Sequence, residues 1–229
     1  MRLSERDLDI LQDIKNHIII LQKQIKTKYD LKDSNVSKRV KVFEENNYVK
    51  SNNIKLYKYL QLEPNGLQTT GIDPLHDKRI YQNCIKENYS LVSVREYIML
   101  FEYEIRKIKN GEENFKTYAN HIAKDYFTIE NEKKSEKFMK QFRNHLSIND
   151  EGEKRIVIID YPLNTKNKII GEFKQIEEFL EGYSVDIIFE KNDILSERQK
   201  LYSEIYNSMD FDFEINPITM EIDFNIIDI

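Results

Sequence analysis

The sequence predicts a mixed α+β or α/β fold, and three patterns along the chain support this prediction. An amphipathic helix is followed at once by a hairpin pattern within residues 34–60. A longer helical pattern fills residues 93–110 and has apolar side chains on one continuous face. A run of β-branched residues, which is typical of a buried strand, begins at Arg155. We therefore expect a helical N-terminal part with a hairpin, a helical middle, and a small mixed β-sheet with helices near the end.

Residues that interrupt regular structure mark the expected boundary of the first domain. The densest cluster of such residues comprises Pro64, Gly66, Gly71 and Pro74. Because clustered prolines and glycines are typical of turns and linkers, this cluster predicts a domain boundary. The expected domains are residues 1–71, a helical connector at residues 72–150, and an α/β domain at residues 151–229.

The helix expected at residues 34–46 is amphipathic. Its buried stripe has the i, i+4, i+7 spacing and consists of Val36, Val40 and Phe43. Asp33 or Ser34 is expected to cap the helix start by accepting a hydrogen bond from a free backbone N–H. Asn46 or Asn47 suits the left-handed residue that often ends a helix.

The elements around this helix follow a familiar order. Two helices are expected before it, one starting where Ser4 and Asp7 nearly match a capping box and one at about residues 18–28. After it, residues 48–60 are typical of a small antiparallel hairpin with a break at Ser51–Asn53. Three helices and then a hairpin form the order of a winged helix-turn-helix domain, which places its third helix in the DNA major groove.

This fold predicts double-stranded DNA as the partner and names the contacting residues. The polar face of the third helix would read bases, because Asn can pair with adenine and Lys can donate to guanine. That face comprises Asn35, Ser37, Lys38 and Lys41, and Ser34 and Arg39 of the same helix are also expected to contact DNA. Phosphate contacts, which give affinity rather than sequence choice, are expected from Lys23, Lys26 and Lys28. The hairpin would contribute Asn52, Asn53 and Lys55.

The charge is sorted along the chain. The overall net charge of −5 does not by itself suggest a nucleic-acid-binding protein. However, residues 1–71 carry 13 Lys and Arg against 9 Asp and Glu, a net +4, and residues 72–200 carry 22 against 24, a net −2. Residues 201–229 carry seven carboxylates and no Lys or Arg, a net −7. The basic end therefore coincides with the expected DNA-binding domain.

Residues in the first third of the chain also resemble a known family. The segments ERDLDIL, SKRVKVFEENNYVK and YKYLQLEPNGLQTTG resemble the N-terminal domain of the plasmid replication-relaxation winged-helix proteins. The chain keeps the family pattern at Arg6, Asp7, Ile10, Leu11, Lys38, Arg39, Phe43, Val49, Tyr59 and Gly66. It departs at Asn47, where the family tends to have Gly, and at Glu63. The resemblance implies DNA binding in plasmid or phage biology.

The helix expected at residues 93–110 has the strongest pattern in the chain. Ser93 and Glu96 form a capping box, and Gly111 follows its end. Its apolar face comprises Val94, Tyr97, Ile98, Met99, Phe101, Ile105 and Ile108. Because this face is wider than one small domain needs, the helix is either a dimer interface, which would make the protein a homodimer, or a buried central helix. Further helices are expected at residues 113–126 and 130–146.

The C-terminal part has two expected strands, at residues 155–162 and 182–191, and two interpretations of the segment between them. One helix from about Lys168 would give a β-α-β unit with parallel strands. Alternatively, residues 168–174 form a strand that is hairpinned to the first, with a helix after it. A further helix is expected at residues 194–209.

The hairpin interpretation would assemble a candidate active site. Asp160 would end one strand, and Glu172 and Lys174 would lie in the next, which resembles the pattern of the PD-(D/E)xK nucleases. In such a site the carboxylates hold Mg²⁺, which activates a water molecule and neutralises the phosphate. The alternative interpretation is that Asp160 ends a strand and Glu172 is solvated.

The last segment, residues 209–229, alternates apolar and polar residues around Asn216-Pro217. It is expected to form the antiparallel edge of the C-terminal sheet, as two short strands or as one strand with a break. The functional alternative is an acidic tail that docks on a protein partner or competes with DNA for the basic N-terminal domain.

Other chemistry finds little support in the sequence, so no cofactor and no metal site are expected. The single Cys84 cannot form an internal disulfide, and the four histidines are scattered. The longest apolar run, at residues 18–21, is far too short for a membrane span, and the polar start predicts no secretory signal. We therefore expect a cytoplasmic protein with no membrane partner.

Taken together, the sequence favours a sequence-specific DNA-binding protein of a plasmid or phage, without enzymatic activity. It would act as a transcription regulator or as a replication or maintenance factor, with a C-terminal domain that assembles, senses or recruits. The alternatives are a Mg²⁺-dependent nuclease and a winged-helix adaptor that binds proteins but not DNA.

Overall fold

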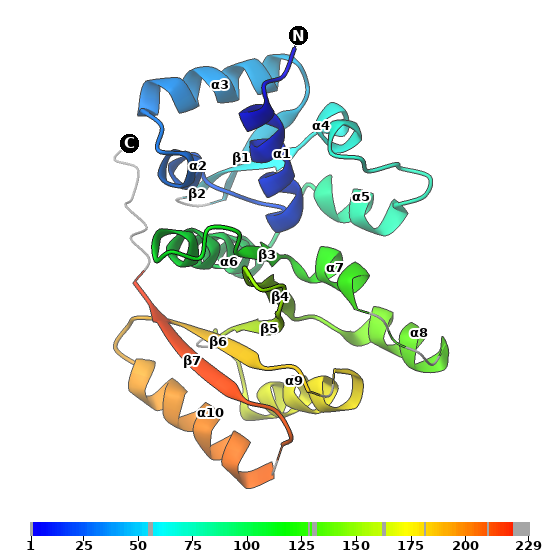
Figure 1. The fold of residues 1–229 in the computed structure, drawn as a ribbon, viewed down its shortest axis with the longest axis vertical. Coiled ribbons are helices and arrows are strands. Elements are labelled where there is room, and N and C mark those ends of the chain that lie inside the picture. The colour runs from blue at the N-terminus through cyan, green and yellow to red at the C-terminus, as the bar shows by residue number, and fades with distance from the viewer. Residues whose placement is uncertain are drawn as a thin grey trace. The chain divides into compact units, whose positions relative to one another are not determined.

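The protein contains two compact units. The structure, a computed structural model, describes residues 2–54, 57–127, 129, 132–161, 164–180, 182–209 and 211–221. Unit 1 comprises Met1–Gly111 and unit 2 comprises Glu112–Asp223. The described residues form ten α-helices, a two-stranded antiparallel sheet and a five-stranded mixed sheet, so the chain has a mixed α and β fold (Figure 1). These units differ from the expected division into residues 1–71, 72–150 and 151–229.

Unit 1 begins with three helices, α1 (Glu5–His17), α2 (Gln22–Tyr29) and α3 (Asp33–Glu45). The predicted capping box is present, since the Ser4 side chain accepts from the Asp7 N–H and the Asp7 carboxylate accepts from the Ser4 N–H. The cap expected at the start of α3 is not found, because Lys32 occupies the N-cap without a side-chain hydrogen bond. Asn47 has the predicted left-handed backbone, with φ of 56°.

The second helix starts four residues later than predicted because the chain before it pairs with the hairpin. Ile18 ends α1 with a positive φ of 69°. Ile20 then forms an antiparallel bridge to Leu60, with N–O distances of 3.3 and 2.8 Å. Both side chains are fully buried, so this bridge joins the start of α2 to the hairpin through the core of unit 1.

The hairpin consists of β1 (Val49–Ile54) and β2 (Tyr57–Leu62), paired antiparallel from Val49–Leu62 to Ile54–Tyr57. The expected break at residues 51–53 is wrong, because these residues continue β1 and pair with residues 58–60. Unit 1 then continues with α4 (Pro64–Thr69), α5 (Lys78–Cys84) and α6 (Leu91–Lys109).

The cluster of prolines and glycines lies within unit 1. Pro64 lies in the first turn of α4, where its missing N–H costs nothing. Gly66 is buried, and a Cβ atom at this position would overlap the backbone carbonyl oxygen of Tyr48. The glycine therefore permits close packing of α4 on the chain before β1, and unit 1 continues past it to Gly111.

Helix α6 is an internal element of unit 1. The Gln24 side-chain amide donates to the Ile98 carbonyl at 2.8 Å, and the rings of His17 and Phe101 lie 4.4 Å apart. The apolar face that suggested a dimer is buried within one chain, except for the partly buried Ile108. Burial in the single chain favours the other alternative, a buried central helix.

Unit 2 is built on a sheet with the strand order β3-β4-β5-β6-β7. Its strands are β3 (Lys116–Tyr118), β4 (His145–Ile148), β5 (Lys154–Ile159), β6 (Val185–Glu190) and β7 (Ile215–Met220). β3, β4 and β5 pair antiparallel, whereas β5, β6 and β7 pair parallel.

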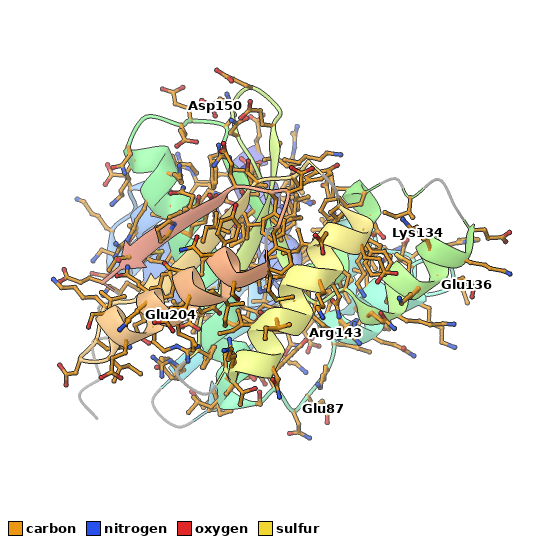
Figure 2. The ribbon with its side chains drawn as sticks, turned by 90° about the horizontal axis from the view of Figure 1, so that it is seen from below. Glu87, Lys134, Glu136, Arg143, Asp150 and Glu204 are labelled. Carbon is orange, nitrogen blue, oxygen red and sulfur yellow. The ribbon has the colours of Figure 1, made fainter. Side chains whose placement is uncertain are left out.

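The helices of unit 2 are α7 (Asn120–Ala123), a 3₁₀ turn (Lys124–Tyr126), α8 (Glu132–Gln141), α9 (Lys166–Phe179) and α10 (Leu195–Met209). α9 and α10 lie on the same face of the sheet (Figure 1). Their apolar residues join Ile156, Ile158 and Val185 of the strands in one core, in which Phe173 of α9 is fully buried. The charged side chains on their outer sides, such as Glu204 on α10, project away from the ribbon, as does Glu136 on α8 (Figure 2).

Two predictions for unit 2 are wrong and one is confirmed. Residues 113–126 form β3 and two short helical turns in place of one helix. The helix expected to reach residue 146 ends at Gln141. Both differences arise because β3 pairs with β4 and β4 pairs with β5. The β-α-β interpretation of residues 155–191 is confirmed by α9 and the parallel pair β5–β6.

The last strand, β7, forms the expected sheet edge but runs parallel to β6, not antiparallel. It is one strand that continues through Asn216-Pro217, and Pro217 is tolerated because an edge strand has one side without ladder partners. The alternating residues from 222 onward lie outside the described part of the chain. None of the described helices has an apolar stretch long enough to cross a bilayer.

Candidate nucleic-acid interface

Helix α3 has one buried and one exposed stripe. The predicted apolar stripe is confirmed, since Val36, Val40 and Phe43 are all buried. The opposite stripe is exposed and brings together Ser34, Asn35, Ser37, Lys38 and Lys41. Five of the predicted contact residues thus share one solvent-facing surface, which offers hydroxyl, amide and ammonium groups to a ligand.

The hairpin presents fewer of its predicted residues. Asn52 is half-buried and donates from its side-chain amide to the Gln61 side chain at 3.1 Å. Asn53 is exposed, and its cross-strand partner Lys58 is exposed as well. Lys55 lies outside the described residues. The exposed polar surface of the hairpin therefore centres on Asn53 and Lys58, and Lys58 was not among the predicted residues.

The lysines expected to contact phosphates have three different environments. Lys23 is exposed on α2. Lys26 is partly exposed and forms an ion pair of 2.7 Å with Asp33, which is itself 81% exposed. Lys28 is only 8% exposed and pairs with two carboxylates inside unit 1, so its predicted phosphate contact is wrong. A periodic sequence pattern does not reveal this, because one of the two partners of Lys28 is 76 residues away in the sequence.

The two partners of Lys28 belong to a buried charge cluster that joins α1, α2 and α6. We call Asp13, His17, Lys28, Tyr29 and Glu104 the Lys28 cluster. The Lys28 ammonium lies 2.8 Å from an Asp13 carboxylate oxygen and 2.6 Å from a Glu104 carboxylate oxygen. Tyr29 donates to Asp13 at 2.7 Å, and His17 Nε2 lies 3.4 Å from the other oxygen of Glu104. The cluster fixes the first two helices against α6.

The cluster shifts the pKa values of its members according to their partners. Burial raises the pKa of Asp13, and the positive charge of Lys28 offsets this upward shift only in part. Burial also acts to raise the pKa of Glu104, but the charges of His17 and Lys28 and their hydrogen bonds overcome it and lower that pKa to about 2. Burial acts to lower the pKa of Lys28, and the two carboxylates raise it instead. Glu104 and Lys28 are therefore held in their charged forms.

Arg39 connects α3 to the start of α1. Its Nε lies 2.9 Å from Asp7 Oδ1, and Asp7 is buried while the Arg39 side chain is 40% exposed. The other Asp7 oxygen, Oδ2, accepts from the Ser4 N–H at 2.8 Å, which is the capping-box bond. One carboxylate thus caps α1 and orients the guanidinium of Arg39. The capping role of Asp7 was predicted, but its pairing with Arg39 was missed in the sequence, although both residues are among those on which the family resemblance rests.

A groove of about 770 Å³ lies between the start of α1 and α3. Its polar lining includes Arg6 and Asp7 from α1 and Asn35, Lys38 and Arg39 from α3. We call this the α1–α3 groove. Because Asn35 and Lys38 line the groove and also belong to the exposed stripe of α3, the groove and that stripe form one continuous surface.

The predicted nuclease site is not assembled. It required residues 168–174 to be a strand beside Asp160, but Glu172 and Lys174 lie on α9. Lys174 is exposed, and Glu172 forms an ion pair of 3.7 Å with Lys168 along the same helix. The hairpin interpretation on which the site depended is therefore wrong.

Asp160 instead belongs to an ion pair that joins the end of β5 to α10. Arg198 donates from Nε and Nη2 to the two Asp160 oxygens at 2.9 and 2.5 Å, and from Nη1 to the Asn164 carbonyl at 3.0 Å. The Arg198 guanidinium also lies 5.8 Å from the centre of the Tyr202 ring. Burial, with the charges of Asp160 and Glu172, raises the pKa of Tyr202. With all three of its nitrogens engaged, Arg198 holds α10 in place.

In the part of the chain that the structure describes, the metal-binding side chains are not grouped into a site. Within the described residues, no three His, Cys, Asp or Glu side chains are grouped to hold a metal ion. Cys84 is buried, and burial raises the pKa of its thiol to about 12, which keeps it protonated and unreactive at neutral pH.

No protein-family model, curated protein or solved structure matches this chain. The resemblance of the first third to replication-relaxation proteins therefore stays a prediction.

Proposed function

We propose that unit 1 contains a winged helix-turn-helix domain and that the protein binds double-stranded DNA in a sequence-specific manner. The observation that carries this proposal is the exposed polar stripe of α3, which lies opposite a buried apolar stripe in a helix-helix-helix-hairpin unit. The bridge between Ile20 and Leu60 supports it, because it pairs the chain before α2 with the hairpin. In such domains the third helix enters the major groove and the hairpin touches the backbone or the minor groove.

The side chains of α3 fit this role chemically. Asn35 can make two hydrogen bonds to adenine, and Lys38 or Lys41 can donate to guanine. Lys41 is 75% exposed and only 3.9 Å from Glu45, which is a weak pair that DNA can displace. Asn53 at the hairpin is exposed for a backbone contact. Base reading is thus assigned to α3, and phosphate contacts to the hairpin and Lys23.

We propose a role in transcription regulation or in replication or maintenance of a plasmid or phage. The family resemblance of the first third and the net charge of +4 on residues 1–71 support this role. Unit 2 would assemble, sense or recruit. Binding as a homodimer to a repeated or palindromic site remains part of the proposal, and its interface would be a surface other than the buried face of α6. Contact of the acidic tail with a protein partner also remains a prediction.

The experiment is DNA binding by the full chain at several salt concentrations, with DNA from around its own gene as the probe. The test variant is Lys38→Ala/Lys41→Ala. The matched control is Lys174→Ala/Lys200→Ala, which removes two exposed helical lysines and changes the net charge equally. Lys200 is a close match for Lys41, since it is 78% exposed and lies 3.8 Å from the glutamate four residues on.

We expect salt-sensitive binding that the control retains and the test variant loses. Equal binding by wild type and test variant would contradict the role of α3. A folded wild-type protein that binds no DNA would contradict the proposal and favour the protein-binding adaptor.

A further inference from the structure

The side chain of Arg39 is held by the buried Asp7 carboxylate and is partly exposed to solvent. The closest atoms of its ion pair with Asp7 are Nε and Oδ1, 2.9 Å apart, and a guanidinium carries five N–H donors, so it can also donate to a second acceptor. The Arg39 side chain is partly exposed and lines the α1–α3 groove. A guanidinium held at one edge by a buried carboxylate loses little further freedom when its other edge binds an oxyanion.

The chemistry around Arg39 suits a phosphate. Arg6 on α1 and Lys38 on α3 also line the groove, and both are exposed. Of the two carboxylates in its lining, Asp7 is already bound to Arg39 and the Ser4 N–H, which leaves Glu5 to oppose the three cations. Arginine pairs with phosphate through two parallel hydrogen bonds, and lysine adds a point charge.

The position of the groove indicates that the bound phosphate belongs to the backbone of a DNA strand. Asn35 and Lys38 line it and also lie on the stripe of α3 that we assign to the major groove. A DNA strand that borders this major groove would therefore pass the start of α1.

We propose that the α1–α3 groove binds a backbone phosphate of the DNA that α3 reads, through Arg6 and Arg39, with Asp7 as the positioning residue for Arg39. This inference rests on the proposed DNA binding and adds α1 to its interface. It also assigns an unusual effect to Asp7, because an acidic residue beside DNA here strengthens binding.

The sign of the effect of Asp7→Asn tests the positioning role. If Asp7 only repels DNA, its neutralisation tightens binding. If Asp7 orients Arg39, its neutralisation weakens binding. The expected loss is about tenfold, which corresponds to one charge-assisted contact between Arg39 and a phosphate. Ser4→Ala is the matched control, because it removes the opposite half of the capping box and leaves the pair of Asp7 with Arg39 intact.

The salt dependence of binding tests the phosphate contact. Each lost phosphate contact lowers the slope of log K against log salt by about 0.9 for duplex DNA. Arg39→Gln and Arg6→Gln are each expected to produce this reduction, whereas Lys174→Ala leaves the slope unchanged. A purely structural role of Arg39 would lower affinity but leave the slope as in wild type.

The outcomes separate this inference from the proposed function. Weaker binding in Asp7→Asn, unchanged binding in Ser4→Ala and reduced slopes in the two arginine variants support the groove. Wild-type slopes in both arginine variants, or tighter binding in Asp7→Asn, overturn it while DNA binding through Lys38 and Lys41 stands. If Asp7→Asn fails to fold, the slopes of the arginine variants decide. No DNA binding by the wild type overturns both.

Discussion

Replacement of Lys28 by methionine is expected to destabilise unit 1 strongly, because the lysine is the shared cation of two buried carboxylates. Its ammonium lies 2.8 Å from Asp13 and 2.6 Å from Glu104, and the three side chains are 8%, 4% and 0% exposed. Methionine has a similar length, so Lys28→Met removes the charge with little change in packing. Both carboxylates then remain in a site that water does not reach.

The expected loss is large compared with that of an ordinary ion pair. Removing one partner of a buried ion pair costs about 3–5 kcal/mol. For a unit of this size that loss corresponds to a fall in Tm of roughly 10–20 °C. Lys26→Met is the matched control on the same helix, because its partner Asp33 is exposed. An exposed pair contributes less than about 1 kcal/mol.

The assay is urea unfolding of the full chain followed by circular dichroism, with wild type and both variants at pH 7. Addition of Glu104→Gln to Lys28→Met is expected to restore part of the loss, because it neutralises one of the two stranded charges. The reasoning is refuted if Lys28→Met costs no more than Lys26→Met. It is also refuted if the double variant loses more unfolding free energy than the two single variants lose together.

Three further predictions concern the fold. Gly66→Ala is expected to destabilise unit 1 by about 1–3 kcal/mol, because the added Cβ overlaps a backbone carbonyl. Gly171→Ala lies in a helix with open space around it and should stabilise unit 2 by about 0.5–1 kcal/mol. Shifts of the unfolding temperature in the same direction for both variants would contradict this. The folded-state pKa of Glu104 is lowered from 4.5 to about 2, so its contribution to stability is complete above pH 4.5 and is lost as the pH falls toward 2. Between pH 5 and 3 the wild type should therefore lose stability more steeply than Glu104→Gln, and parallel curves would refute this. Arg198→Leu should destabilise unit 2 by about 3–5 kcal/mol and be partly rescued by Asp160→Asn; absence of rescue in urea unfolding would show that the charge pair is not the cause.

The parts of the fold that the sequence predicted are those that local patterns determine. The stripe of Val36, Val40 and Phe43, the capping box at Ser4 and the left-handed Asn47 each depend on neighbours within a few residues. The β-α-β unit was one of two interpretations, and the apolar face of α9 on the core of unit 2 decides for it.

The wrong predictions concern pairings between distant residues. Residues 116–118 and 145–148 are strands because they pair with each other and residues 145–148 pair with β5, which no local periodicity shows. Similarly, Gly66 is a packing residue because the Tyr48 carbonyl approaches it, not because the chain turns there.

The candidate site was predicted only in part for the same reason. The exposed residues of α3 follow from its helical period. The burial of Lys28 depends on Glu104 of α6, and the fixed orientation of Arg39 depends on Asp7 of α1. A sequence pattern identifies the lysines and arginines but not the carboxylates that hold them.

The central claim is that α3 of this protein reads DNA, and the most direct test compares the Lys38→Ala/Lys41→Ala variant with the Lys174→Ala/Lys200→Ala control. The measurement is the dissociation constant for duplex DNA from around its own gene as a function of salt concentration. Our account predicts salt-dependent binding by wild type and control and its loss in the α3 variant, with all three proteins equally folded. Equal binding by the α3 variant and the control would contradict it.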